Sequence, residues 1–334
     1  MGRKVIDPLS TLPSREVSLS RQLLCSVALV LVGFQPVRAS TVVVPDAFST
    51  VQSAIDSGAD TVLIREGTYA ERPVVDHAVV LQGIGVAQRP RLAGLAIFNS
   101  YFWAFPPLLS VDRIDFSGRV EHTTLYYRPR SLLFSFSDCS LDSGFYQVVS
   151  LDPNDVDRLT LRRCHLGAAS NARIFRVIME ADTIDGSVYW TLTHQDRISD
   201  CWFRGGPDGA ITLNQSVSDT LANNRIDHYL TGISVSDGDD TVVDANELTN
   251  CEVGIQYPGG GPVYITNNLI RDCGVGINAY GDDRQLVGNS IIRARGDGIQ
   301  SGGAELLIQG NVVGSCGGSG LLINGATIRG WVKD

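Results

Sequence analysis

Lysine, long apolar runs and closely spaced cysteine and histidine pairs are all scarce in this sequence, and each shortage argues against a class of function. Only two lysines accompany 25 arginines, and the formal net charge is −9. Without a basic stripe, nucleic acid is not expected as a partner. The apolar run at 23–34 has 12 residues, which is short for a membrane span. We therefore expect no membrane span in the mature chain.

Cysteine and histidine do not occur at the spacing of a metal site. There is no Cys-x-x-Cys pair, and the five histidines are scattered, so a transition-metal centre is not expected. We expect no cofactor other than calcium. Beyond residue 39 the sequence has six cysteines, most of which follow a strand and a polar residue, so we expect inward, reduced thiols in one stack. They are Cys139, Cys164, Cys201, Cys251, Cys273 and Cys316.

The N-terminal 39 residues have the pattern of a secretory signal. The apolar run is preceded by Arg15 and Arg21 and followed by Val37-Arg38-Ala39, which predicts cleavage after Ala39. A retained N-terminal anchor is the alternative. Cleavage removes five cations and two anions and leaves a net charge of −12. The predicted location is secreted, periplasmic or at the cell surface. Residues 40–334 contain no Pro/Ser-rich linker, which favours a single domain.

From about residue 205 to 334 the sequence repeats every 22 residues. A Gly-Ile pair recurs at this period, with Ala-Ile before it and Gly-Leu after it, and an Asn-x-apolar marker runs alongside with spacings of 22, 22, 21 and 22. Such a period indicates a solenoid whose units bury their apolar faces against one another. The pairs begin at Ala210, Gly232, Gly254, Gly276, Gly298 and Gly320, and the markers begin at Asn224, Asn246, Asn268, Asn289 and Asn311.

Twenty-two residues accommodate three short strands better than two helices. In one unit, residues 247–250, 254–256 and 263–266 have strand composition, and a Pro-Gly-Gly-Gly corner at 258–261 separates the last two. Asparagine tolerates left-handed backbone angles, and its amide can bond to an asparagine in the next coil. We therefore predict an asparagine ladder at one corner.

These residues resemble the right-handed parallel β-helix of the pectate-lyase-like superfamily, over roughly residues 41–334. The start of the mature chain fits as well, because Ser49-Thr50-Val51-Gln52 predicts a short capping helix that buries Val51, Ala54 and Ile55 and ends at Gly58. Strands are predicted at 60–64, 67–71 and 79–83. The resemblance implies an all-β parallel β-helix of about ten coils with a helical N-terminal cap. It specifies a fold and no reaction.

In the related family, the substrate groove commonly follows one strand stack, and the Gly-Ile stack matches it. If each Ile points inward, the next residue points outward and forms a neutral row. This row predicts binding of extracellular polysaccharide, chiefly through Gln256, Asn278 and Gln300. Its full membership is Thr212, Ser234, Gln256, Asn278, Gln300 and Leu322.

Aromatic residues offer a second means of holding sugar rings. The run 101–105 and the Tyr189-Trp190 pair can stack on pyranose faces, because aromatic faces are flat, apolar and rigid. We single out Trp103 and Trp190 as candidates. Packing in the core or as loop anchors is the simpler interpretation of both.

Acidic residues supply the candidates for catalysis and for calcium. Asp282, Asp283, Arg295 and Asp297 are predicted to form one charged corner that combines an acid/base with an arginine clamp. Asp239 and Asp240 are candidate calcium ligands. Solvated turns and surface ion pairs explain the same residues more simply. Gly281-Asp282-Asp283 resembles one element of the polygalacturonase family, but the companion Ser-His-Gly and Arg-Ile-Lys elements are missing.

The sequence thus predicts a secreted or cell-surface β-helix module that binds polysaccharide. A polysaccharide lyase or glycoside hydrolase is the alternative, and a structural repeat domain of a larger surface protein is a third interpretation. Gly330-Trp331-Val332-Lys333-Asp334 forms no recognisable polar cap. We therefore expect a further domain or a partner to cover the last coil.

Overall fold

The computed structural model describes residues 40–99, 108–124, 133–148, 158–167, 169–170, 176–324 and 332–333. The predicted signal sequence, residues 1–39, lies outside them, as do Trp103 and residues 325–331. Within the described part, no helix is long and apolar enough to span a membrane.

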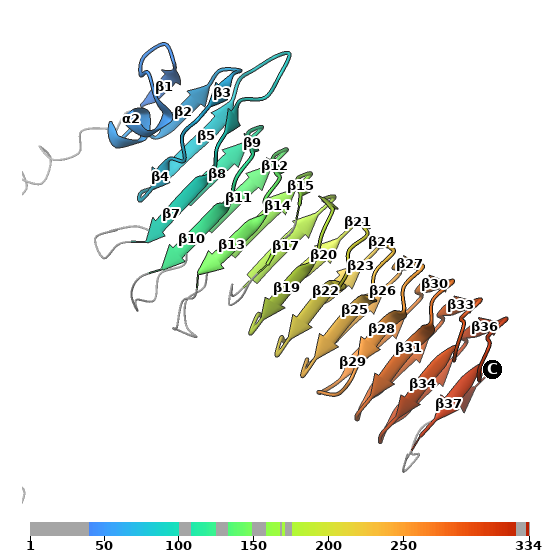
Figure 1. Ribbon diagram of the computed structural model, residues 1–334. Coiled ribbons are helices and arrows are strands. Elements are labelled where there is room, and N and C mark those ends of the chain that lie inside the picture. Colours follow the sequence, from blue (N-terminus) through green and yellow to red (C-terminus); the bar gives the residue numbers. More distant parts are fainter. Residues whose placement is uncertain are drawn as a thin grey trace, which may run out of the picture. The chain divides into compact units, whose positions relative to one another are not determined.

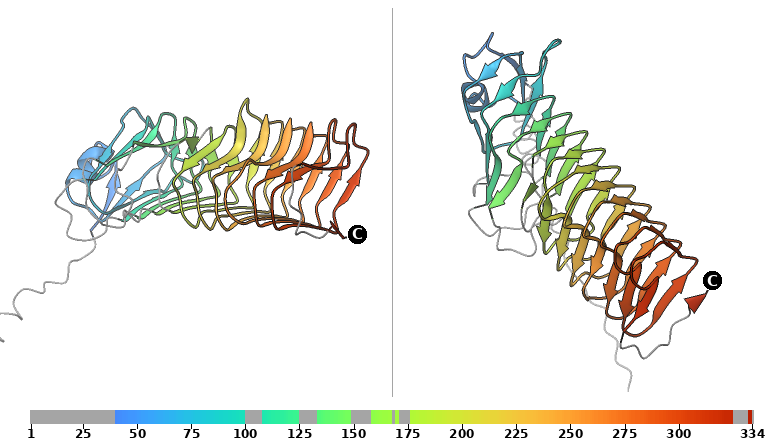
Figure 2. Two further views of the ribbon diagram at one scale, coloured as in Figure 1. Left: turned by 90° about the horizontal axis from the view of Figure 1, so that it is seen from below. Right: turned by 45° about the vertical axis from the view of Figure 1, so that its right-hand side comes forward.

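Residues 40–334 form one compact unit that is a right-handed parallel β-helix, as predicted (Figure 1). Each complete turn contributes one strand to each of three parallel sheets, called sheets A, B and C here, and β1 (Thr41–Val44) and β38 (Val332–Lys333) add a strand to sheet A at each end. The sheets have 14, 12 and 12 strands, slightly more than the expected ten coils supply. Figure 2 shows the coils stacked one behind another along this unit.

Sheet A consists of β1 (Thr41–Val44), β2 (Thr61–Ile64), β5 (Val79–Gly83), β8 (Leu108–Asp112), β11 (Leu133–Ser137), β14 (Arg158–Arg162), β17 (Arg176–Glu180), β20 (Arg197–Ser199), β23 (Thr220–Ala222), β26 (Thr241–Asp244), β29 (Val263–Thr266), β32 (Arg284–Val287), β35 (Leu306–Gln309) and β38 (Val332–Lys333). Sheet B consists of β3 (Thr68–Tyr69), β6 (Arg91–Leu92), β9 (Asp115–Phe116), β12 (Ser140–Leu141), β15 (His165–Leu166), β18 (Thr183–Ile184), β21 (Trp202–Arg204), β24 (Arg225–Asp227), β27 (Glu247–Thr249), β30 (Leu269–Arg271), β33 (Ser290–Ile292) and β36 (Val312–Gly314). Sheet C consists of β4 (Val74–Val75), β7 (Leu95–Asn99), β10 (Val120–Thr124), β13 (Phe145–Val148), β16 (Ala169–Ser170), β19 (Val188–Thr191), β22 (Gly209–Asn214), β25 (Thr231–Ser236), β28 (Val253–Tyr257), β31 (Val275–Tyr280), β34 (Ile299–Gly302) and β37 (Leu321–Ile323).

The recurring Gly-Ile pair lies in sheet C, and its two residues have separate roles. The isoleucines are at most 1% exposed and stack in the core. Glycine precedes four of the five and alanine precedes Ile211, because the wall leaves little room for a side chain. A Cβ on Gly232 would lie 2.4 Å from Leu248 Cδ2 and 2.6 Å from the Gly254 carbonyl oxygen. The repeat is therefore a packing requirement. The stacked isoleucines are Ile211, Ile233, Ile255, Ile277 and Ile299.

The predicted asparagine ladder is present at the corner between sheets A and B. Asn246 Oδ1 accepts hydrogen bonds from the backbone N–H and the Nδ2 of Asn224, at 3.0 and 2.9 Å, and Asn246 Nδ2 donates to Leu221 O at 2.9 Å and to Asn268 Oδ1 at 3.0 Å. Each buried amide thereby satisfies the backbone of its neighbours. The ladder members are Asn224, Asn246, Asn268, Asn289 and Asn311.

Towards the N-terminus other residues occupy the same ladder position. Cys201 follows the left-handed residue Asp200 and donates its backbone N–H to Asn224 Oδ1 at 3.1 Å. Asp182 follows a left-handed alanine, and its Oδ1 accepts from Cys164 N at 2.7 Å. Burial raises the pKa of the Asp182 carboxyl to about 7. The ladder thus changes from amides to thiols and a carboxyl.

The six cysteines are free thiols, and five of them are buried, as predicted. The expectation of a single stack is wrong, because they lie at two corners. Three of them follow strands of sheet A and three follow strands of sheet B. Both corners have a residue with positive φ followed by an inward residue, such as Asp200-Cys201 and Asp272-Cys273, so one sequence pattern describes both. The first corner holds Cys139, Cys164 and Cys201, and the second holds Cys251, Cys273 and Cys316.

The N-terminal cap is the helix α2 (Val51–Asp56). Thr50 is its N-cap, with its side chain accepting from Ser53 N, and the helix buries Val51, Ala54 and Ile55 as predicted. Glu71 Oε1 accepts the free N–H of Val51 at 2.8 Å. The helix therefore covers the apolar end of the first coil with its N-terminal amides satisfied.

Candidate functional site

The predicted neutral row lies on the outer face of sheet C. Its members are Cα partners from strand to strand, and neighbouring strands are about 4.8 Å apart. All of them are partly buried, and the first five follow a buried isoleucine. The row therefore lines up hydroxyl and amide groups along the β-helix. It consists of Thr212, Ser234, Gln256, Asn278, Gln300 and Leu322.

Two amides of this row differ in their hydrogen bonding. Gln300 Nε2 donates to Asp297 Oδ2 at 2.7 Å, which fixes the side chain. Asn278 Oδ1 is shielded from solvent and has no hydrogen-bond partner among the described residues. An unsatisfied acceptor of this kind is unfavourable by roughly 1–3 kcal/mol. A ligand hydroxyl that reached Asn278 after a small side-chain movement would relieve this deficit.

The row continues towards the N-terminus to an exposed aromatic residue. Tyr189 is the Cα partner of Thr212 and is 42% exposed. It lies in a shallow pocket of about 430 Å³ between the loops that precede β19 and β22. A phenol ring beside hydroxyl groups suits a ligand with both apolar and polar faces. The pocket is lined by Gly186, Ser187, Tyr189, Pro207, Asp208, Gly209 and Thr212.

A buried tyrosine holds the two loops of this pocket. Tyr229 Oη donates to Gly186 O at 2.7 Å, and burial raises the pKa of its phenol. The ring also packs on Gly206, where a Cβ would lie 2.7 Å from Tyr229 Cε1. Leu230 N donates to Asp208 O at 3.1 Å. The loops are thus positioned from the core, so that the pocket needs little ordering when a ligand binds.

The structure replaces Trp190 with Tyr189 as the candidate aromatic residue for sugar stacking. Trp190 is 2% exposed and packs in the core, so its proposed role in sugar stacking is wrong. Successive side chains of a strand point to opposite faces, and Val188 is the partner of the inward Ile211. Tyr189 therefore faces outward and Trp190 inward. Pairing Val188 with Ile211 places Tyr189 beside Thr212 in the outward row and identifies it as the exposed aromatic residue. Trp103 lies outside the described residues and stays a prediction.

The predicted catalytic residues lie at two corners instead of one. Asp282 and Asp283 follow the C-terminal end of β31, whereas Asp297 lies beside its start, where Gly276 N donates to Asp297 O at 3.1 Å. Six residues of extended chain separate these ends by about 20 Å. Paired glycosidase carboxyls lie about 5–9.5 Å apart. The expectation of one charged corner is therefore wrong. The sequence alone did not reveal that a strand of sheet C separates its two halves.

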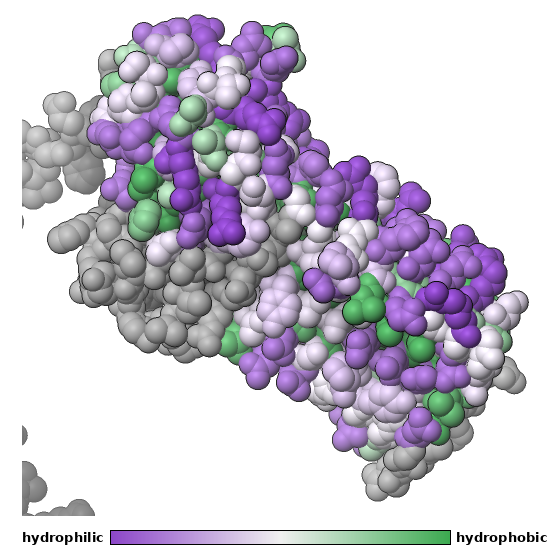
Figure 3. Space-filling model, viewed as in Figure 1, coloured by the Kyte–Doolittle hydropathy of each residue, from purple (hydrophilic) through white to green (hydrophobic). Residues whose placement is uncertain are grey.

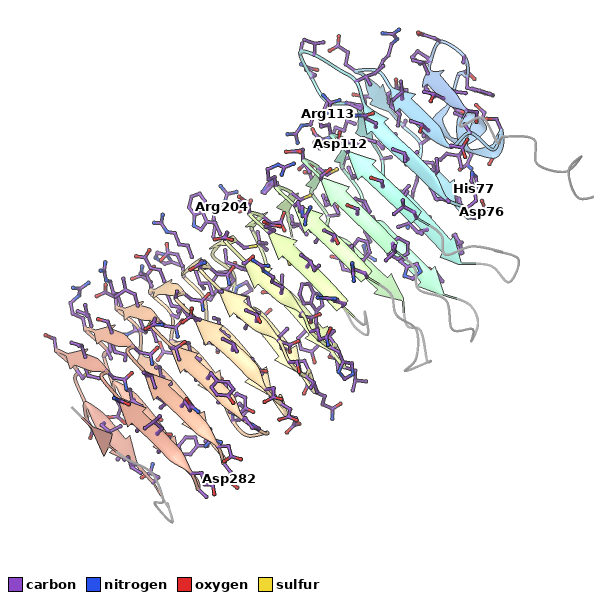
Figure 4. All side chains as sticks on the ribbon, turned by 180° about the vertical axis from the view of Figure 1, so that it is seen from behind. Asp76, His77, Asp112, Arg113, Arg204 and Asp282 are labelled. Carbon is purple, nitrogen blue, oxygen red and sulfur yellow. The ribbon has the colours of Figure 1, made fainter. Side chains whose placement is uncertain are left out.

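The same residues have local structural partners. Arg295 forms an exposed ion pair with Glu252 at 2.7 Å, and Asp297 Oδ1 accepts from Ser319 N at 2.6 Å. Asp282 Oδ1 caps Ala304 N at 2.7 Å. Asp283 has a left-handed backbone and lines a second shallow pocket, of about 310 Å³, on the outer face of sheet A. Figure 4 shows Asp282 and Arg204 at opposite long edges of the molecule.

The predicted calcium ligands fit an ion poorly. Asp239 and Asp240 are exposed turn residues, and the Asp239 carbonyl already accepts from Ser218 N at 2.8 Å. Calcium takes six to eight oxygen ligands. No group of three or more His, Cys, Asp or Glu side chains in the described ranges could hold a metal ion. Binding of calcium by Asp239 and Asp240 stays a prediction.

The surface in view in Figure 3 is mostly hydrophilic, with hydrophobic side chains scattered over it. A broad apolar patch would have indicated a protein or membrane contact.

Comparison with known proteins supports the fold. The family model described as "Right handed beta helix region" matches residues 186–330. Tailspike protein 3 of bacteriophage CBA120 is 16% identical over 86% of this chain, with a TM-score of 0.53. The chain spans 57% of that protein's length. DFA-IIIase from Arthrobacter chlorophenolicus A6, solved without its lid, is 12% identical over 89% of this chain and 94% of its own, with a TM-score of 0.55. No curated protein sequence matches.

Proposed function

Since this chain is a right-handed parallel β-helix protein with the pectate-lyase-like fold, we propose that it binds extracellular polysaccharide along the outer face of sheet C and does not cleave it. The observation that carries the proposal is the register of one outward row, which runs from Tyr189 through Thr212 to Gln300. Such a row offers a long polymer repeated hydrogen-bonding groups. The proposed place of action is outside the cytoplasm, following the predicted signal sequence.

The chemistry of the row suits a neutral or weakly charged sugar chain. Hydroxyl and amide side chains donate to and accept from sugar hydroxyls without the desolvation penalty of a full charge. Tyr189 at one end supplies a flat surface for a pyranose C–H face. Since the strands hold the whole row in place, little conformational entropy is lost when a polymer binds.

Cleavage is not part of the proposal, because the predicted catalytic residues lie at two separate corners and most of them have structural partners. Asp297 is hydrogen-bonded to Gln300 and to Ser319 N, and Arg295 is paired with Glu252. Asp282 and Asp283 lie at the other end of the strand. A structural repeat domain of a larger surface protein remains the third interpretation. This third interpretation predicts that no polysaccharide in the gel will retard the protein.

The full chain should be run in native gels that contain acidic or neutral polysaccharides, with Tyr189→Ala beside it. We expect at least one polysaccharide to retard the protein and Tyr189→Ala to weaken the retardation about tenfold, the equivalent of ~1.4 kcal/mol of lost stacking. Tyr264→Ala is the matched control, since Tyr264 is a partly buried tyrosine on the outer face of sheet A. Equal loss in both variants, or no retardation in any gel, would contradict the proposal.

A further inference from the structure

A second exposed aromatic residue lies on the outer face of sheet B. Trp202, the first residue of β21, is 42% exposed. Its ring has two guanidinium groups against it, because the Cζ atoms of Arg204 and Arg225 each lie 5.3 Å from the ring centroid. This arrangement lies on a different sheet from the row of Tyr189. The two guanidinium groups on its ring distinguish Trp202 from a singly exposed apolar residue.

One of the two arginines is neutralised. Arg204 donates to both carboxylate oxygens of Asp185, at 2.6 and 2.7 Å, and His165 Nε2 lies 2.7 Å from the same carboxylate. The hydrogen bond from Arg204 lowers the pKa of Asp185. Bidentate pairing fixes the guanidinium in place. Arg204 therefore forms a rigid wall of the site and carries little free charge.

The other arginine is not neutralised. In the described part of the chain no carboxylate lies within ion-pair distance of Arg225. Its register neighbour is Glu247, yet its guanidinium lies over Trp202 instead. Asp227 lies two residues further along β24. Its carboxylate accepts hydrogen bonds from Thr249 Oγ1 at 2.6 Å and from the Asn250 amide, and it forms no ion pair with Arg225. Arg225 thus keeps a full positive charge and free donors above an aromatic ring, in a protein whose net charge is −9.

We propose that Trp202 and Arg225 form a binding site for a carboxylate-bearing sugar unit, a hexuronate. The exposed indole takes the apolar C–H face of the pyranose ring, while the guanidinium of Arg225 donates two parallel hydrogen bonds to the carboxylate. This inference does not depend on the row of sheet C. It places the binding site for acidic sugars on the outer face of sheet B.

The surroundings favour a sugar over a protein partner. The outward neighbours of Trp202 and Arg225 in the same register are His165, Thr183 and Glu247. A protein interface places its aromatic anchors within an apolar, well-packed centre. Here a single ring is surrounded by polar and charged groups, which is the composition expected for one sugar unit.

Calorimetric titration of the full chain with trigalacturonate, and with maltotriose as a neutral trisaccharide of the same length, tests the inference. We expect trigalacturonate to bind more tightly than maltotriose and to weaken as salt rises. Arg225→Gln and Trp202→Ala should each reduce trigalacturonate affinity at least tenfold. Arg271→Gln removes an equal charge on sheet B, two coils further along, and should change the affinity less than twofold.

Two outcomes would overturn the inference. Equal affinity in Arg225→Gln and Arg271→Gln would show that only the overall charge matters. Absence of trigalacturonate binding to the wild-type chain would exclude the site and point to a protein contact at Trp202. This result would leave the sheet C proposal untouched, because the gel retardation of the wild-type chain and of Tyr189→Ala tests that proposal separately.

Discussion

Asn246→Ala is expected to destabilise the protein by about 4 kcal/mol, one of the two largest effects we predict. The substitution removes the acceptor of Asn224 N and the donor to Leu221 O. Asn268 Oδ1 loses one of its two donors and keeps the backbone N–H of position 246. Each buried polar group left without a partner is unfavourable by roughly 1–3 kcal/mol. Urea unfolding followed by circular dichroism measures the change.

Asn214→Ala is the matched control for the ladder. Asn214 lies at the end of β22 and is only partly buried. We expect its replacement to change the free energy of unfolding by less than about 0.5 kcal/mol, as for most surface substitutions. A loss of similar size in the two variants would mean that the ladder does not hold the coils together.

Asp196→Asn is expected to stabilise the protein at alkaline pH and to leave it almost unchanged near pH 4. Asp196 and Asp219 are buried carboxyls in adjacent coils, and Asp219 Oδ1 accepts from Asp196 N at 2.9 Å. Burial first, and then the negative charge of Asp219, raises the pKa of Asp196 to about 8. The pKa of Asp219 is raised as well, chiefly by burial.

The sign follows from proton linkage. A raised folded-state pKa means that the native protein holds its proton more tightly than the unfolded chain, whose carboxyl has a pKa of 3.8. This stability is fully present below about pH 4 and is lost as the pH rises through 8. The loss in the wild type is on the order of 6 kcal/mol, and Asp196→Asn should remove most of it.

Thermal unfolding measured from pH 4 to 9 tests this expectation. Asp240→Asn, which changes an exposed carboxyl near the same corner, should retain the pH dependence of the wild type. If Asp196→Asn instead retained the wild-type slope, or lowered stability at pH 8.5, the buried carboxyls would not control the alkaline limit.

The fold could be predicted because packing imposes its own period. The four coils that contain Ile233, Ile255, Ile277 and Ile299 each place the isoleucine inward after a glycine, and they turn at residues with positive φ. These requirements repeat every 22 residues and are visible without coordinates. The same holds for α2, whose buried residues were all predicted.

The site was less predictable, because several positions share one local pattern. Cysteines at two different corners each follow a residue with positive φ, so the sequence could not separate the two stacks. Tyr189 and Trp190 are adjacent aromatics, and only the register with Ile211 determines which one faces outward. Asp283 and Asp297 are 14 positions apart, but the extended strand of sheet C that separates them places them at opposite edges.

Hydroxyl-radical footprinting of the full chain, with and without a polysaccharide that retards it, tests the central claim most directly. We expect oxidation of Tyr189 to fall at least fivefold when the polysaccharide is present, while oxidation of Tyr264 on sheet A stays the same. Protection of Tyr264 with Tyr189 unchanged would place the ligand elsewhere and contradict binding along sheet C.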